Sequence, residues 1–168
     1  MEEFHDWAKT DLQTSLELDP KSYLAILHPL TIAKTYNDKH LADIYLKRGN
    51  TLLPSNFLVR ASYLIHLAPR WGGSYSEMKS FIAASGAQGV PKRDIDLLTA
   101  IMISDQGDTA REQQQTDLSQ YAYVKALTLG TLGGPRFRED YLHNAARICK
   151  EPGHRVKDYC RYAPRRPY

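Results

Sequence analysis

Two cysteines and a histidine near the C-terminus are the side chains of this chain best suited to bind a metal ion. Cys149, His154 and Cys160 lie close together in the sequence, and they include both cysteines of the chain. Thiolate and imidazole groups are the ligands that zinc prefers, in a tetrahedral set of four. His143 precedes Cys149 by six residues and is the candidate for a fourth ligand. The spacing indicates a candidate zinc site, and we expect no other cofactor.

The same residues resemble the second half of a retroviral-type zinc knuckle. In that pattern, Cys-x2-Cys-x4-His-x4-Cys, a glycine often precedes the histidine, and Cys149, Gly153 and His154 match this spacing. Ala146 stands where the first cysteine would be, and five residues instead of four separate His154 from Cys160. The resemblance implies zinc at Cys149, His154 and Cys160. Two alternatives stay open: the cysteines form a disulfide, or Cys149 packs as a small apolar residue while Cys160 is exposed.

Basic residues are concentrated in the same stretch, residues 136–168. It holds nine Lys/Arg and four Asp/Glu, a net charge of +5, whereas the whole chain carries +3, which leaves −2 for residues 1–135. Lysine and arginine neutralise phosphate groups, and aromatic rings between them stack on unpaired bases. The residues expected to contact nucleic acid are Arg147, Lys150, Arg155, Lys157, Tyr159, Arg161, Tyr162, Arg165 and Arg166.

Two other groups of residues have spacings found in enzymes. Glu139, Asp140 and His143 would share one face of a helix, where a carboxylate can orient a histidine as a general base. Tyr121 and Lys125 resemble the Tyr-x3-Lys pair of short-chain dehydrogenases, but no strand followed by a glycine-rich cofactor turn precedes them. The simpler interpretations are a solvated ion pair for the first group and a surface-to-core pair on a helix for the second.

Apolar residues recur at helical spacing along most of the chain, most clearly over residues 55–68. Strand-like alternation is not sustained in any stretch, and no fixed repeat period is visible. The sequence therefore predicts an all-α protein of seven to nine short helices with an irregular basic tail. His28 and His66 lie beside apolar stripes and are expected in the interior or at its boundary.

Local signals predict where the helices begin and end. The expected starts are at Asp19–Pro20, Asn37–Asp38, Ser74 with Glu77, Pro91, and Thr109 with Glu112. The expected kinks or stops are at Pro29, Gly49, Gly86–Gly89 and Asp105–Asp108. The last predicted helix spans residues 136–149. We expect residues 1–135 to form a helical core domain and residues 136–168 to form a basic helix and tail.

The chain shows no apolar run near the ~20 residues that a membrane helix needs. Its acidic first residues, Met1 to Asp6, do not resemble a signal peptide. We therefore expect an intracellular protein, cytoplasmic or nuclear, with reduced thiols and no membrane partner.

Three functions are compatible with these features. The first is a non-enzymatic helical protein of the packaging or accessory kind that contacts the phosphates of nucleic acid, including RNA, through its basic end. The second is a helical interaction or oligomerisation module, which binds an acidic protein surface or a second copy of itself. The third is a small helical enzyme that uses His143 with Glu139 and Asp140, or the cluster of Cys149, His154 and Cys160.

Overall fold

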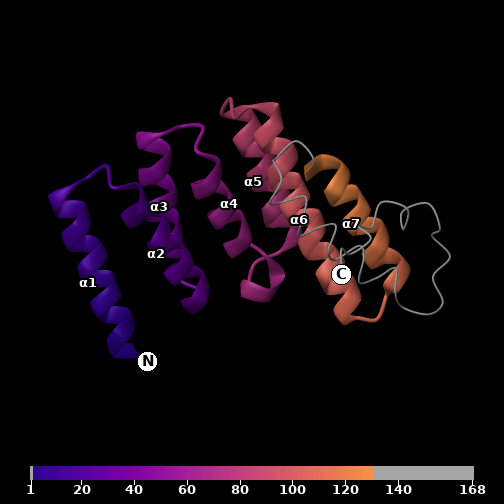
Figure 1. Cartoon of the computed structure of the whole chain (residues 1–168), viewed down its shortest axis with the longest axis horizontal. Helices are drawn as coiled ribbons and strands as arrows, with labels where there is room; N and C mark the ends of the chain where they lie inside the picture. Colours follow the sequence, from indigo (N-terminus) through magenta and orange to yellow (C-terminus); the bar gives the residue numbers. More distant parts are fainter. Residues whose placement is uncertain (1, 131–168) are drawn as a thin grey trace, which may run out of the picture. The chain divides into compact units, whose positions relative to one another are not determined.

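The computed structural model describes residues 2–130 of the chain. It places them in seven α-helices and one short 3-10 helix, with no strand among the described residues (Figure 1). The all-α class expected from the apolar spacing is therefore confirmed for this part of the chain. The helices are α1 (Glu2–Leu18), α2 (Tyr23–Tyr36), α3 (Lys39–Leu52), α4 (Phe57–His66), η1 (Pro69–Trp71), α5 (Tyr75–Ala87), α6 (Lys92–Glu112) and α7 (Thr116–Gly130).

The chain divides into two compact units between Pro91 and Lys92. Unit 1 contains α1 to α5, and the described part of unit 2 contains α6 and α7. The domain boundary predicted between residues 135 and 136 lies outside the described residues, as do the helix predicted over residues 136–149 and the irregular tail. These expectations stay predictions.

In unit 1 each α-helix packs against the next one along the chain, and α2 also packs against α4 (Figure 1). A contact between alternate helices, such as α2 with α4, is typical of helical hairpins that stack on one another. Here one hairpin is α2 with α3, and the next is α4 with α5. The core of the stack is apolar: Ile26 and Leu30 of α2 and Val59 and Leu64 of α4 are almost completely buried. Burial of these side chains holds the helices together.

Gly49 allows α3 to approach α2 and α4 closely. A Cβ atom at this position would lie 2.8 Å from Val59 Cγ1 and 3.3 Å from Ile26 Cγ2. Carbon atoms in contact are normally about 3.5–4.0 Å apart, so no larger side chain fits without displacing its neighbours. The helix continues through Gly49 to Leu52. The prediction that it stops at Gly49 is wrong, because the glycine permits close helix packing.

Helix α2 begins later than predicted and passes through its proline. Ser22 occupies the N-cap position, whereas Asp19 accepts a backbone hydrogen bond in the turn before the helix. Pro29 lies buried inside α2, which shows no interruption there. A proline removes one backbone hydrogen bond from a helix. The buried side chains of Ile26 and Leu30, on either side of it, keep both turns packed in the core.

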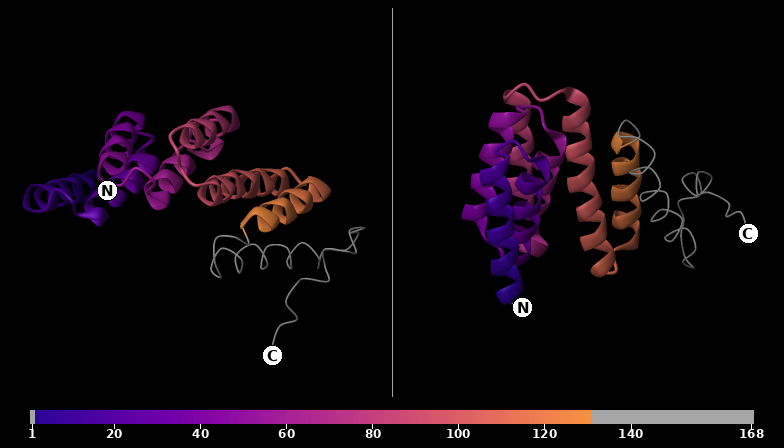
Figure 2. Two further views of the ribbon diagram at one scale, coloured as in Figure 1. Left: turned by 90° about the horizontal axis from the view of Figure 1, so that it is seen from above. Right: turned by 60° about the vertical axis from the view of Figure 1, so that its left-hand side comes forward.

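In unit 2, α6 and α7 lie side by side and form a helical hairpin (Figure 2). Helix α6 continues through the stop predicted at residues 105–108, and a Cβ atom at Gly107 would lie 2.9 Å from Tyr123 Cε1 of α7. Thr109 lies inside α6 and donates its hydroxyl hydrogen to the Asp105 carbonyl at 3.1 Å. The capping box predicted at Thr109 is therefore wrong, and the next helix begins at Thr116.

Candidate functional site

The residues predicted to bind nucleic acid or zinc, or to act in catalysis, lie outside the described residues. This applies to the basic and aromatic set from Arg147 to Arg166, to Cys149, His154 and Cys160, and to Glu139, Asp140 and His143. Their assignments stay predictions. Within residues 2–130, no three His, Cys, Asp or Glu side chains are grouped so as to hold a metal ion.

Tyr121 and Lys125 are described, and both are exposed on α7. The Lys125 ammonium lies 6.0 Å from the centroid of the Tyr121 ring, a solvent-exposed cation–π contact. The pair is therefore entirely at the surface, which differs from the surface-to-core arrangement expected. None of the described helices is long and apolar enough to cross a membrane.

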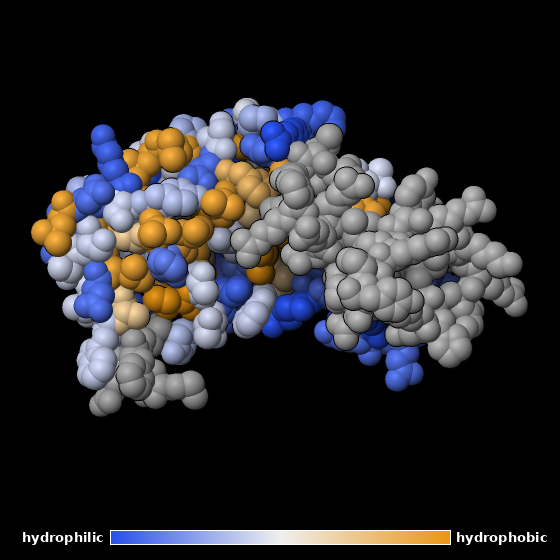
Figure 3. Space-filling model, viewed as in Figure 1, coloured by the Kyte–Doolittle hydropathy of each residue, from blue (hydrophilic) through white to orange (hydrophobic). Residues whose placement is uncertain are grey.

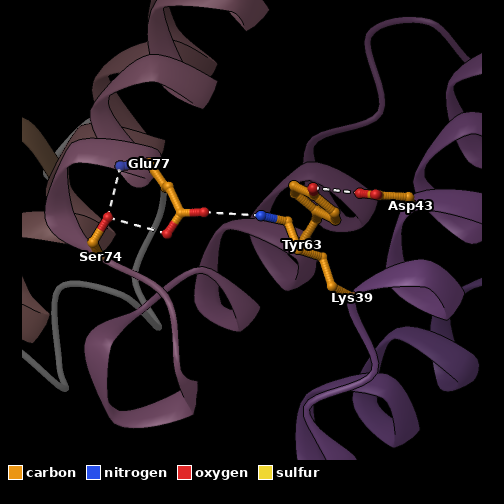
Figure 4. Close-up of polar contacts among 5 residues, drawn as sticks. All are labelled: Lys39, Asp43, Tyr63, Ser74 and Glu77. Carbon is orange, nitrogen blue, oxygen red and sulfur yellow. Dashed lines mark hydrogen bonds and ion pairs between the residues drawn. The ribbon is translucent and has the colours of Figure 1, made fainter.

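Polar side chains from three helices meet in unit 1 (Figure 4). We call Lys39, Asp43, Tyr63, Ser74 and Glu77 the polar cluster. Lys39 Nζ of α3 donates to Glu77 Oε1 of α5 at 2.8 Å. The Tyr63 hydroxyl of α4 donates to Asp43 Oδ1 of α3 at 2.6 Å. Two contacts between side chains far apart in the sequence thus join α3 to both α4 and α5.

Local sequence signals place the members of the polar cluster that lie on α3 and α5. Ser74 is the N-cap of α5, and its Oγ accepts from the Glu77 amide at 3.2 Å while its hydroxyl donates to Glu77 Oε2 at 3.0 Å. The capping box predicted here is confirmed. Asp38 caps α3 by accepting from the Leu41 amide at 2.9 Å, which confirms the predicted start of that helix.

In the ion pair of the polar cluster, both side chains, Lys39 and Glu77, are exposed to solvent. The pKa of Glu77 is lowered mainly by the hydrogen bond from Lys39 and next by the hydrogen bond from Ser74. The same hydrogen bond to Glu77 raises the pKa of Lys39. Both groups therefore stay ionised over a wide pH range. Because water screens an exposed pair, its contribution is mainly to the relative placement of α3 and α5.

Tyr63 is buried, and burial is the main cause that raises its pKa, with further contributions from its hydrogen bond to Asp43 and from the charge of that carboxylate. Its ring lies 4.9 Å from the Phe81 ring, measured between centroids, in a tilted arrangement. The phenol therefore keeps its proton and donates a hydrogen bond to Asp43. This geometry suits a structural contact between helices, whereas acid–base chemistry needs a group that titrates near the working pH.

His66 lies close to Tyr63 on α4. Its side chain is 3% exposed, its ring centroid lies 6.2 Å from that of Tyr63, and its Nδ1 atom is buried without a hydrogen-bond partner in the described part of the chain. Burial is the main cause that lowers the pKa of His66. The expectation of an interior histidine is met at His66, whereas His28 is exposed.

Arg60 is a buried cation that joins the ends of two helices to α4. Its Nη1 donates to Ser85 Oγ of α5, and its Nη2 donates to the Pro54 carbonyl and to Gln88 Oε1, each at 2.9 Å. Burial lowers the pKa of Arg60. All three acceptors are neutral. Pro54 follows the C-terminus of α3 and Gln88 caps that of α5, so the negative ends of two helix dipoles lie near the guanidinium group.

Sequence reasoning missed Arg60 and most of the polar cluster. The available signal for Arg60 was weak: a charged residue between Val59 and Ala61, within the clearest apolar helix of the chain. In the described part of unit 1, the hydrogen bonds given above for the polar cluster and Arg60 join side chains to other parts of the same unit. Their arrangement can hold α3, α4 and α5 in position.

A comparison with curated proteins and with solved structures yields no match. The model of one protein family, described as "Domain of unknown function (DUF4034)", matches residues 10–103. This segment covers more than half of the 168 residues and includes all of α2 to α5, so Arg60, His66 and the polar cluster lie within it. The chain therefore belongs to the DUF4034 family.

Proposed function

We propose that this chain is a non-enzymatic, nucleic-acid-associated protein of the packaging or accessory kind. Its helices form a scaffold, and residues 136–168 contact phosphate groups. The observation that carries the proposal is the separation of charge along the chain. Residues 1–130 hold thirteen Lys/Arg and fifteen Asp/Glu, a net charge of −2, whereas residues 136–168 hold nine and four, a net charge of +5.

Contacts of the described basic side chains support the placement of phosphate binding at the C-terminal end. Arg60 is buried, and Lys39 forms an ion pair with α5. Lys34 Nζ lies 5.1 Å from the centroid of the Trp71 ring, and Lys92 forms an ion pair within α6. These cations contact other groups of the same chain, and over residues 1–130 negative charges outnumber positive ones by two. The C-terminal residues expected to neutralise phosphate are Arg147, Lys150, Arg155, Lys157, Arg161, Arg165 and Arg166, and Tyr159 and Tyr162 are the expected stacking platforms.

The test is the salt dependence of binding to single- and double-stranded DNA and RNA, measured by fluorescence anisotropy on the full chain. In a plot of the logarithm of the binding constant against the logarithm of the salt concentration, the magnitude of the slope should decrease by about 0.7 to 0.9 for each phosphate contact removed. Arg161→Gln, Arg165→Gln and Arg166→Gln together should therefore reduce the slope by about 2 to 3. The matched control replaces three exposed lysines of unit 1 with glutamine and should leave the slope unchanged. They are Lys9 of α1, Lys21 in the turn after α1, and Lys47 of α3.

Equal slopes for the arginine variant and the lysine control would contradict the proposal. Absence of binding by the full chain at about 50 mM salt, where phosphate contacts are strong, would also contradict it.

A second candidate function, self-association through unit 1, is supported by exposed apolar side chains. Leu58 and Ile65 lie seven residues apart on α4, hence on one face of the helix, and are 49% and 36% exposed. Leu18 and Leu24 near the junction of α1 and α2 are also exposed. Figure 3 shows apolar residues gathered on one face over α1 to α4. Apolar groups gathered in this way are typical of interaction surfaces.

We propose that the exposed face of α4 with Leu58 and Ile65, which we call the α4 surface, binds a second copy of this chain. Residues 1–91 hold nine Lys/Arg and nine Asp/Glu, so unit 1 has no net charge that would repel an identical unit. A two-fold axis brings the same surface of both copies together, and an apolar stripe on a helix can pair with itself in this way. Burial of Leu58 and Ile65 would supply the driving force.

Light scattering coupled to gel filtration tests this candidate. The mass of the full chain should rise from 19.1 kDa toward twice that value as concentration increases. Leu58→Glu with Ile65→Glu should keep it monomeric, whereas the control Thr31→Glu with Thr35→Glu, at two exposed polar positions of α2, should associate as the unmodified chain does. A mass of 19.1 kDa at every concentration, or an equal effect of the two pairs, would refute self-association through this surface.

A further inference from the structure

Within unit 1, His66 is a titratable group placed where its charged form is poorly accommodated. The imidazole is 3% exposed, and its Nδ1 atom has no hydrogen-bond partner among the described residues. The neighbouring Tyr63 hydroxyl already donates to Asp43 at 2.6 Å. A buried polar atom without a partner is uncommon in folded proteins and calls for an explanation.

Of the three helices that pack against α4, α3 and α5 carry charged groups that act on His66. Asp38 and Asp43 from the start of α3, and Glu77 from α5, favour a protonated imidazole, whereas Lys39 of α3 disfavours it. Burial outweighs these carboxylates, and the pKa of His66 is lowered as a result. Asp43, the carboxylate whose charge acts most strongly on His66, already accepts the hydrogen bond from Tyr63.

We infer that His66 makes unit 1 acid-sensitive: uptake of a proton by its buried imidazole loosens α4 from α3 and α5. The inference does not depend on the proposed function, because it concerns how firmly the helices are held. The cation would form beside the Tyr63 ring, and a hydrated imidazolium is reached only when α4 moves away from its neighbours. The polar cluster, which joins the same three helices, would open with it.

The direction of the pH dependence follows from the lowered pKa of His66. An unfolded or locally opened chain takes up the proton near the ordinary histidine pKa of about 6.5, before the folded chain does. The neutral, buried His66 therefore stabilises folded unit 1 fully above about pH 6.5, and this stabilisation is lost as the pH falls below that value. At about pH 5.5, one unit lower, the opened form is favoured up to about tenfold more than at neutral pH.

Hydrogen exchange of the full chain, followed by mass spectrometry at about pH 7.5 and 5.5 and corrected for intrinsic exchange rates, tests the inference. Protection of α4 should fall by up to about tenfold at the lower pH. His66→Phe, which keeps an uncharged ring, should show equal protection of α4 at both pH values. The matched control, His40→Gln at an exposed position of α3, should behave as the unmodified chain does.

Equal protection of α4 in the unmodified chain at both pH values would overturn the inference, as would a pH effect that survives in His66→Phe. Nuclear magnetic resonance of the histidine rings gives a second test. It uses only the unmodified chain, so it does not depend on whether a variant folds. The His66 ring, identified by its proximity to the Tyr63 ring, should titrate below about pH 6.5. Titration of His66 at or above that value would equally overturn the inference.

Discussion

Replacing Gly49 with alanine would place a methyl group where α3 contacts α4. The new Cβ atom would lie 2.8 Å from Val59 Cγ1 and 3.0 Å from Val59 Cγ2. Val59 is completely buried, so it cannot turn toward solvent. Alanine favours a helix over glycine by about 1 kcal/mol, whereas an additional methyl group in a packed core costs about 1–3 kcal/mol. The expected net result is a loss of up to about 2 kcal/mol in the free energy of unfolding.

A second substitution separates the steric effect from the helix propensity. Val59→Ala removes both atoms that the methyl group at position 49 would contact. By itself this change should cost about 1.5–3 kcal/mol, from lost burial and from the cavity it leaves. In the double variant, the methyl group at position 49 occupies part of that cavity. The double variant should therefore lose less than the sum of the single losses, by about 1–2 kcal/mol.

Urea unfolding followed by circular dichroism, on the unmodified chain, the two single variants and the double variant, measures this difference. The control is Gly86→Ala, at an exposed glycine inside α5, which should be neutral or stabilising by up to about 1 kcal/mol. Losses for Gly49→Ala and Val59→Ala that add within about 0.5 kcal/mol would refute the close approach of α3 to α4. A stabilising Gly49→Ala would lead to the same conclusion.

Two further predictions concern Arg60 and the helical hairpin of unit 2. Ser85→Ala should lower the free energy of unfolding by about 1–3 kcal/mol, because Arg60 Nη1 loses its buried acceptor; an unchanged urea midpoint would contradict this. Gly107→Ala should reduce the hydrogen-exchange protection of α6 and α7, because its Cβ atom would lie 2.9 Å from Tyr123 Cε1. Unchanged or increased protection of both helices would show that the hairpin has room for the methyl group.

The sequence predicted the fold class and the helices whose signals are local. The all-α class followed from the spacing of apolar residues, and the starts of α3 and α5 followed from the capping residues Asp38, Ser74 and Glu77. Several of the errors concern helix stops predicted at or near glycine. Gly49 and the segment Asp105–Asp108, which contains Gly107, were interpreted as local stop signals, but contacts with other helices determine the roles of both glycines. Tertiary packing overrode the local preference in each case.

The candidate site was less predictable, because its contacts join residues that no local pattern connects. Lys39 and Glu77 are 38 positions apart, and Arg60 and Ser85 are 25 positions apart. In the sequence, only its position between Val59 and Ala61 distinguishes Arg60 from the exposed charged residues of other helices. Of this group of contacts, the capping box of Ser74 with Glu77 could be predicted, since its residues are three positions apart.

The contact between Arg60 and Pro54 has a consequence for how this part of the chain can vary between relatives. The guanidinium group binds the backbone carbonyl of Pro54, so many side chains could occupy position 54 without loss of the hydrogen bond. An inserted or deleted residue between α3 and α4 would instead move that carbonyl away from Arg60. We therefore expect the connection to tolerate substitutions while keeping a constant length.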